Sequence, residues 1–132
     1  MAEKAKYPKE YKEDTAYITL GLTDPHDSYL THWRASIIPS QAVVIGDRIY
    51  GLKIRCHRDY PEEPPQVCFV QRVCGTKFID SRGNVNVSML MGKWKRTFLL
   101  MDILIALRSH LATTAKLHAS IPASATYSSP AF

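Results

Sequence analysis

The sequence predicts an α+β fold, in which an antiparallel sheet is built first and a helix then covers one of its faces. Apolar and polar residues alternate through much of the first half of the chain, whereas apolar residues recur at helical spacing over residues 100–111. The 132-residue length suits one domain with a core of its own. A composition of 45% hydrophobic and 22% charged residues is that of a globular protein and excludes a disordered or fibrous class.

Four segments have the two-residue period of half-buried strands. In the third of them, Tyr50, Leu52 and Ile54 share one face, and polar or small residues occupy the other. Short connections with turn-forming residues, such as Asp24–Asp27, separate the segments. Consecutive strands joined in this way predict an antiparallel meander. We expect strands over Thr15–Leu20, Tyr29–Ile38, Arg48–Cys56 and Gln66–Gln71.

The second half of the chain changes character. Val73–Lys93 contains three glycines and no sustained periodicity, which predicts a long irregular segment. Such segments are usually functional or inherited from a functional ancestor. A helix is expected next, with Thr97 as its N-cap and Asp102 favourably placed in its first turn. Its apolar stripe would cover one face of the sheet through Leu100, Ile103, Leu104, Leu107 and Leu111.

Several classes of protein do not fit these patterns. The longest apolar run, Phe98–Leu107, is interrupted by an aspartate and is too short to span a bilayer. The charged N-terminal segment lacks the apolar stretch of a secretory signal, so we expect a reducing intracellular compartment. The formal charge of +5 permits acidic partners, but the basic residues are scattered and are not interleaved with aromatic ones. We therefore expect neither a membrane nor a nucleic acid as a partner.

The cysteines and histidines do not form a recognisable reactive or metal-binding motif. Cys56 and Cys68 fall in expected strands, where a buried, inert thiol is usual. Cys74 precedes Gly75 in the irregular segment and could act as a nucleophile only beside a group that favours its thiolate. No C-x-x-C, zinc-type spacing, phosphate loop or G-x-S-x-G motif occurs. We expect no metal and no cofactor.

Outward-facing positions on three expected strands form a candidate contact surface. Ile49 has outward parity, so an apolar side chain lies on the solvent face. Ser36 and Thr19 have the same parity on the two preceding strands, and a connection near residues 39–47 would place Ser36 beside Ile49. These residues predict a small, weakly polar patch with one aliphatic centre. The alternative is a single exposed isoleucine without a function.

The connection after the second expected strand is unusually apolar. Gln41–Ile45 contains four consecutive apolar residues, whereas loops normally carry polar ones. These residues either fold back onto the core or dock on a partner, and both interpretations stay open.

Several motifs resemble the ubiquitin-conjugating enzyme family. They are L-T-H-W-R-A-S-I-I, R-I-Y-G-L-K-I, Y-P-E-E-P-P-Q-V-C-F-V and a tryptophan, Trp94, before the helix; the Y-P-x-x-P-P element is the most specific. The resemblance implies a four-stranded antiparallel meander with helices packed on one face, in a domain over residues 15–127. Residues 1–14 would then be an N-terminal arm or short helix, and residues 128–132 a tail.

The positions that carry catalysis in this family have different residues here. Active members have His-Pro-Asn, followed shortly by the nucleophilic cysteine; the first three positions fall on Thr76, Lys77 and Phe78, and the cysteine position on Asn86. An amide side chain cannot form a thioester, and the asparagine that assists the oxyanion is missing. The chain therefore resembles the non-catalytic variants of the family, and the resemblance implies no catalytic residue.

G-L-T-D, R-I-Y, W-K and K-L…P…T-Y are most similar to the variants that form a heterodimer with an active conjugating enzyme. In that subgroup the active partner holds donor ubiquitin, and the variant orients acceptor ubiquitin so that chains grow through lysine sixty-three of ubiquitin. The resemblance implies acceptor binding by Thr19, Ser36 and Ile49, which is the patch expected from strand parity, and a location in cytoplasm and nucleus. It implies a partner interface formed by Val43, Val44, Ile45 and Tyr11.

Two alternatives remain at this point. The chain could be a stand-alone module of the same fold that binds ubiquitin or proline-rich peptides. It could also be an active conjugating enzyme that uses Cys74 as its nucleophile.

Overall fold

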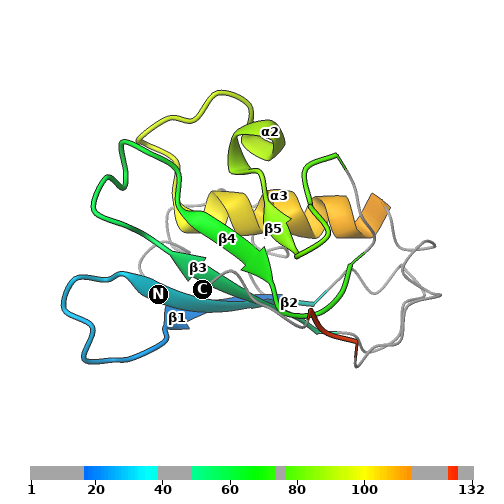
Figure 1. The fold of residues 1–132 in the computed structure, drawn as a ribbon, viewed down its shortest axis with the longest axis horizontal. Coiled ribbons are helices and arrows are strands. Elements are labelled where there is room, and N and C mark those ends of the chain that lie inside the picture. The colour runs from blue at the N-terminus through cyan, green and yellow to red at the C-terminus, as the bar shows by residue number, and fades with distance from the viewer. Residues whose placement is uncertain (1–16, 39–48, 74–76, 114–124, 128–132) are drawn as a thin grey trace.

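A computed structural model describes residues 17–38, 49–73, 77–113 and 125–127. Within these ranges the chain forms a five-stranded antiparallel sheet whose strands lie side by side in chain order (Figure 1). The strands are β1 (Ile18–Leu22), β2 (His32–Ile37), β3 (Tyr50–Arg55), β4 (Gln66–Phe69) and β5 (Asn84–Val85). The helices of the described part are α2 (Val87–Met91) and α3 (Leu100–Thr113).

The strand register aligns the apolar residues into buried rows. Leu20, Ala35, Leu52 and Phe69 are successive partners across four strands, and none is more than 2% exposed. Because side chains alternate along a strand, a slip of one residue would turn such a row toward solvent. The alternation that predicted the strands therefore also determines their register.

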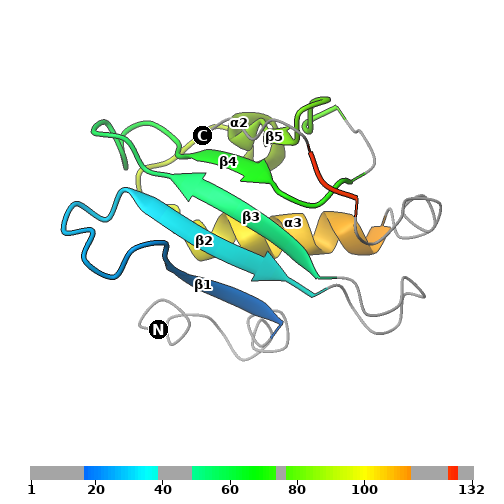
Figure 2. The ribbon, with the colours of Figure 1, turned by 60° about the horizontal axis from the view of Figure 1, so that its bottom comes forward.

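Helix α3 covers the inner face of the sheet. Figure 2 shows it behind β2 and β3, running across the strands. Leu104, Leu107 and Leu111 are fully buried against the sheet, which confirms the predicted apolar stripe. Burying a leucine side chain contributes about 1.5–3 kcal/mol, so this stripe accounts for much of the attachment of the helix. No helix among the described residues is long and apolar enough to cross a bilayer.

The α+β class is confirmed, but several expected bounds are wrong. The second strand begins at His32 rather than Tyr29, because the residues before it belong to a loop closed by Asp27, whose carboxylate accepts hydrogen bonds from three backbone N–H groups. The predicted N-cap, Thr97, lies too far before the helix, and the Asp102 carboxylate instead accepts from the Leu99 N–H at 2.6 Å. Thr15 lies outside the described residues.

The segment expected to be irregular, Val73–Lys93, contains regular structure. It folds back as a narrow hairpin in which Ile79 bridges Val85, and β5 adds a fifth strand to the expected four. Helix α2 follows directly. These elements are too short to produce a visible period in the sequence, because a two-residue strand and a five-residue helix complete hardly one repeat each.

Candidate functional site

A pair of hydroxyl groups lies on the outer face of the sheet, away from α3. Thr19 and Ser36 are direct partners across β1 and β2. Their side-chain oxygens are 2.5 Å apart, and either can donate the hydrogen bond. The accepting hydroxyl keeps its own proton, and both oxygens keep lone pairs, so the pair can donate to and accept from a partner. The two residues therefore form a small polar contact point that is already assembled.

Ile49 lies beside this hydroxyl pair on the same face. Ser36 pairs with Gly51, and Ile49 precedes that glycine by two residues. Because residues two apart along a strand share a face, Ile49 lies on the same outer face as Ser36. Ile49 is 56% exposed, and Ile38, which has the same outward parity, is 39% exposed. The structure thus brings together the three residues of the predicted patch. That prediction omitted Ile38, although its outward parity is readable from the sequence.

Asn86, to which the family resemblance assigns the cysteine position of active conjugating enzymes, is the N-cap of α2. Its side-chain oxygen accepts from the Met89 N–H at 3.0 Å, and its backbone N–H donates to the Phe78 carbonyl at 2.8 Å. An N-cap asparagine satisfies backbone donors that the first helical turn leaves unpaired. The carboxamide therefore has a structural role, and it offers no nucleophilic atom.

The hairpin before Asn86 is organised by a carboxylate. Asp80 accepts hydrogen bonds from the Arg82 N–H at 2.8 Å, and from the backbone and side-chain nitrogens of Asn84 at 2.9 and 3.0 Å. Burial by itself raises the pKa of Asp80, but these bonds to Asn84 and Arg82 outweigh it and hold the pKa below its ordinary value. The carboxylate is thus ionised at neutral pH and serves the turn.

Residues 125–127 pack against this hairpin and the residues after β4. Thr126 bridges Gln71 in antiparallel fashion, and the Tyr127 N–H donates to the Val70 carbonyl at 3.1 Å. The Tyr127 ring lies so close to Gly83 that a Cβ there would meet it at 2.6 Å. Neither contact is visible in the sequence, because it joins segments far apart in the chain.

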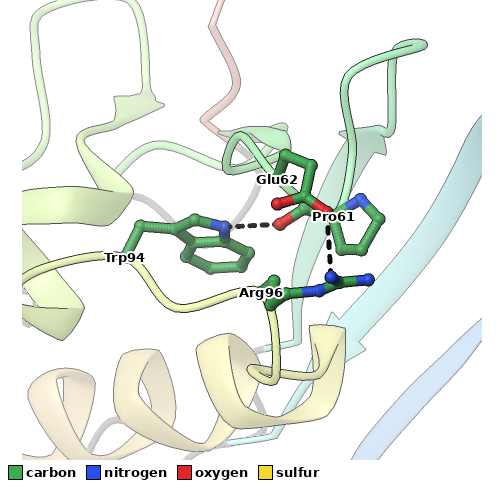
Figure 3. Close-up of polar contacts among 4 residues, drawn as sticks. All are labelled: Pro61, Glu62, Trp94 and Arg96. Atoms are coloured by element: carbon green, nitrogen blue, oxygen red, sulfur yellow. Dashed lines mark hydrogen bonds and ion pairs between the residues drawn. The ribbon is translucent and has the colours of Figure 1, made fainter.

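The Y-P-E-E-P-P loop is fastened to the segment that leads into α3 (Figure 3). The indole N–H of Trp94 donates to the Pro61 carbonyl at 2.8 Å, and Arg96 pairs with Glu62 at 3.4 Å. The Trp94 ring also meets Phe98 edge to face, with centroids 5.4 Å apart. The Y-P-E-E-P-P element and Trp94, which both carry the family resemblance, therefore contact each other and join the loop after β3 to the segment after α2.

Among the described residues, no group of histidine, cysteine or acidic side chains could hold a metal ion. Cys56 and Cys68 are both buried. Phe78, at one of the His-Pro-Asn positions, packs its ring against His110 with centroids 4.5 Å apart. Cys74 and Thr76 lie outside the described residues, as do Tyr11, Val43, Val44 and Ile45 of the expected partner interface.

Comparison with known proteins decides the family. The family model described as "Ubiquitin-conjugating enzyme" matches residues 4–128. The chain belongs to the ubiquitin-conjugating enzyme family. Among solved structures, human ubiquitin-conjugating enzyme E2 G1 is similar with a TM-score of 0.65 and 26% identity, covering 84% of this chain and 87% of that one. A Plasmodium vivax ubiquitin-conjugating enzyme E2 has a TM-score of 0.60 and 19% identity, with 82% and 94% covered.

Curated relatives place this ubiquitin-conjugating family member near the variants. "Ubiquitin-conjugating enzyme E2 variant 1D" of Arabidopsis thaliana is 34% identical over 74% of this chain and 68% of its own length. Ubiquitin-conjugating enzyme spm2 of Schizosaccharomyces pombe is 34% identical, with 71% and 69% covered. Ubiquitin-conjugating enzyme variant MMS2 of Saccharomyces cerevisiae is 31% identical, with 72% and 70% covered. The predicted resemblance to ubiquitin-conjugating enzyme variants is confirmed.

Proposed function

We propose that this ubiquitin-conjugating enzyme variant catalyses no transfer itself and orients acceptor ubiquitin for an active conjugating enzyme with which it forms a heterodimer. The observation that carries the proposal is Asn86, a helix-capping amide at the position where a conjugating enzyme needs a thiolate. Phe78 at the asparagine position leaves that site without a side-chain donor for an oxyanion. What the fold can still contribute is a binding surface.

In the proposed complex, acceptor ubiquitin binds the patch formed by Thr19, Ser36 and Ile49. The exposed isoleucine would supply the apolar contact, and the hydroxyl pair would supply direction through hydrogen bonds. Holding an acceptor lysine near the partner's thioester converts an encounter of two molecules into a step within one complex, which lowers a barrier by about 7–11 kcal/mol in the best cases. The lysine presented by this pose would be lysine sixty-three of ubiquitin.

The test uses the purified chain with activating enzyme, ATP, ubiquitin and a panel of active conjugating enzymes. We expect no ubiquitin thioester on this chain in a non-reducing gel, and free chains joined through lysine sixty-three when the cognate partner is added. A thioester that is lost in Cys74→Ser would instead identify an active enzyme. Binding of ubiquitin or peptide without stimulation of any partner would identify a stand-alone module.

The acceptor face is tested by Ile49→Ala. Loss of a central apolar contact should lower the rate of chain synthesis at subsaturating ubiquitin about tenfold. Met89→Ala is the matched control, because Met89 is 49% exposed on α2, outside the patch, and should leave the rate unchanged. Full activity of Ile49→Ala in an intact heterodimer would show that acceptor ubiquitin binds elsewhere.

A further inference from the structure

A large open pocket lies at the end of the sheet opposite Ile49. Its volume is about 840 Å³, within the range of pockets that bind small ligands and side chains. Trp33, Arg55 and Leu100 from β2, β3 and α3 line it, together with the loop before β2. The β1–β2 loop, the end of β3 and the start of α3 meet at this end in Figure 2. Six residues of extended chain separate Ile49 from Arg55, or about 20 Å, so the pocket is distinct from the proposed acceptor patch.

The walls of the pocket are apolar and held in place. Trp33 and Tyr60 are half-buried and Leu100 is buried, and all three line the pocket. The indole N–H of Trp33 donates to the Leu30 carbonyl at 2.8 Å, which orients the ring. Such a surface would bind a bulky apolar side chain, because the ring faces and the leucine offer no competing polar groups.

The rim of the pocket exposes two large apolar side chains. Tyr29 is 90% exposed and Leu30 is 51% exposed. Tyr29 is therefore more exposed than Ile49 of the acceptor patch, and Leu30 is about as exposed as Ile49. Leu30 has a φ of +55°, which is strained for a residue with a Cβ. The loop nevertheless holds this conformation through the Asp27 carboxylate, which accepts from the Tyr29, Thr31 and His32 N–H groups at 3.2, 2.8 and 3.0 Å. The exposed rim is thus an ordered feature.

The charged side chains that line the pocket have one sign. Arg55 and Arg58 line it, and none of the described lining residues is an aspartate or glutamate. Guanidinium groups bind carboxylates through charge-assisted hydrogen bonds, so this rim favours an acidic partner.

We propose that this pocket docks an acidic segment of a protein partner, with one bulky apolar side chain between Trp33 and Tyr60 and flanking carboxylates on Arg55 and Arg58. The apolar walls select the side chain, and the basic rim selects its neighbours. This site goes beyond the proposed orientation of ubiquitin, because it would let the variant bind a further protein while the acceptor patch stays free.

The test is a titration of the isotope-labelled full chain with a capped peptide, Asp-Glu-Leu-Phe-Asp-Glu, followed by NMR. We expect saturable shifts at the Trp33 indole N–H and at the amides of Leu30 and Thr31, with none at Thr19. A second peptide, in which lysines replace the acidic residues, should cause no saturable shift. Absence of saturation at millimolar acidic peptide, or equal shifts with the lysine peptide or with a single-stranded oligonucleotide, would overturn the proposal.

Two variants connect the binding to the assigned residues. Arg58 is exposed, so Arg58→Glu should fold normally and weaken acidic-peptide binding about tenfold. Lys93→Glu, an equal charge reversal at an exposed position outside the pocket, should bind as the parent does. Leu30→Gly removes the rim side chain at a backbone position that glycine accepts, and it should also weaken binding. Parent affinity in both Arg58→Glu and Leu30→Gly, or equal loss in Lys93→Glu, would contradict the site.

Discussion

Several single residues near residue 86 stabilise the local structure through their side chains or through the lack of one. Asn86 accepts a hydrogen bond from the first turn of α2, and the Asp80 carboxylate accepts three within its hairpin. Gly83 is the third such case, because its φ of +87° lies where a Cβ is strained and its missing side chain admits the Tyr127 ring. The hairpin, the helix cap and the position of Tyr127 therefore depend on three small or polar residues.

Gly83→Ala should destabilise the protein through two effects that a control can separate. Gly92 also has positive φ, +77°, but nothing lies within 4 Å of the place that a Cβ would take, so Gly92→Ala should lower the free energy of unfolding only by its backbone strain, about 1–3 kcal/mol. Gly83→Ala should lower it by about 1–2 kcal/mol more, because the Cβ displaces Tyr127. Urea denaturation of both variants measures the difference. Equal losses would mean that the Tyr127 contact contributes nothing.

At the scale of elements, the β1–β2 loop shows how one acidic side chain sets the start of a strand. The Asp27 carboxylate accepts the His32 N–H, the first of β2, and the Thr31 N–H beside it. The hydrogen bond from the His32 N–H lowers the pKa of Asp27 most; burial opposes the shift, and the bonds from Thr31 and Tyr29 add to it. The loop that carries Tyr29 and Leu30 is thus closed by an ionised group.

The lowered pKa of Asp27 predicts that the loop opens in acid. Because the pKa of Asp27 is lower in the folded state, its ionised form stabilises the fold at pH values above the unfolded-state pKa of about 3.8. This stabilisation is lost as the pH falls through the lower pKa of the folded state. The amide shifts of Tyr29, Thr31 and His32 should therefore change together below about pH 3.8. In Asp27→Asn this shared step should vanish. A transition that persists in the variant would assign it to another group.

For the molecule as a whole, the layers are joined by a few specific bonds in addition to the apolar core. The contact of Trp94 with Pro61 connects the loop after β3 with the segment before α3 (Figure 3). At the end of β2, buried Arg108 of α3 donates its Nε–H to the Ile38 carbonyl at 2.9 Å, beside the patch. The helix layer thus supports the edge of the outer face on which Ile49 lies.

Trp94→Phe and Arg96→Gln compare two contacts of this junction. Trp94→Phe deletes the N–H donor and part of the ring, so the free energy of unfolding should fall by about 1–2 kcal/mol. Arg96→Gln removes an ion pair whose side chains are 68% and 65% exposed, and such pairs contribute about 1 kcal/mol at most. Denaturation followed by far-ultraviolet circular dichroism measures both. A larger decrease in the free energy of unfolding for Arg96→Gln than for Trp94→Phe would show that the ion pair stabilises this junction more than the Trp94 contact does.

The parts predicted correctly are those with a repeating pattern. Alternation at Tyr50, Leu52 and Ile54 and helical spacing from Leu100 to Leu111 extend over enough residues to reveal their period. The hairpin of β5 and the short α2 were missed because neither extends over enough residues to show a period. The outward parity of Thr19, Ser36 and Ile49 was correct for the same reason as the strands, since the side-chain period of a strand also fixes which face each residue takes.

The amino-acid sequence by itself determined the order of strands and helix, the buried face of each strand, and the absence of a thiol at residue 86, because these follow from local period and residue chemistry. Only the tertiary structure decided that the Thr19 and Ser36 hydroxyls bond to each other, that Tyr127 packs on Gly83, and that Leu30 and Arg58 share a pocket. Those contacts join segments distant in the chain, and their geometry depends on strand register and on how the layers pack.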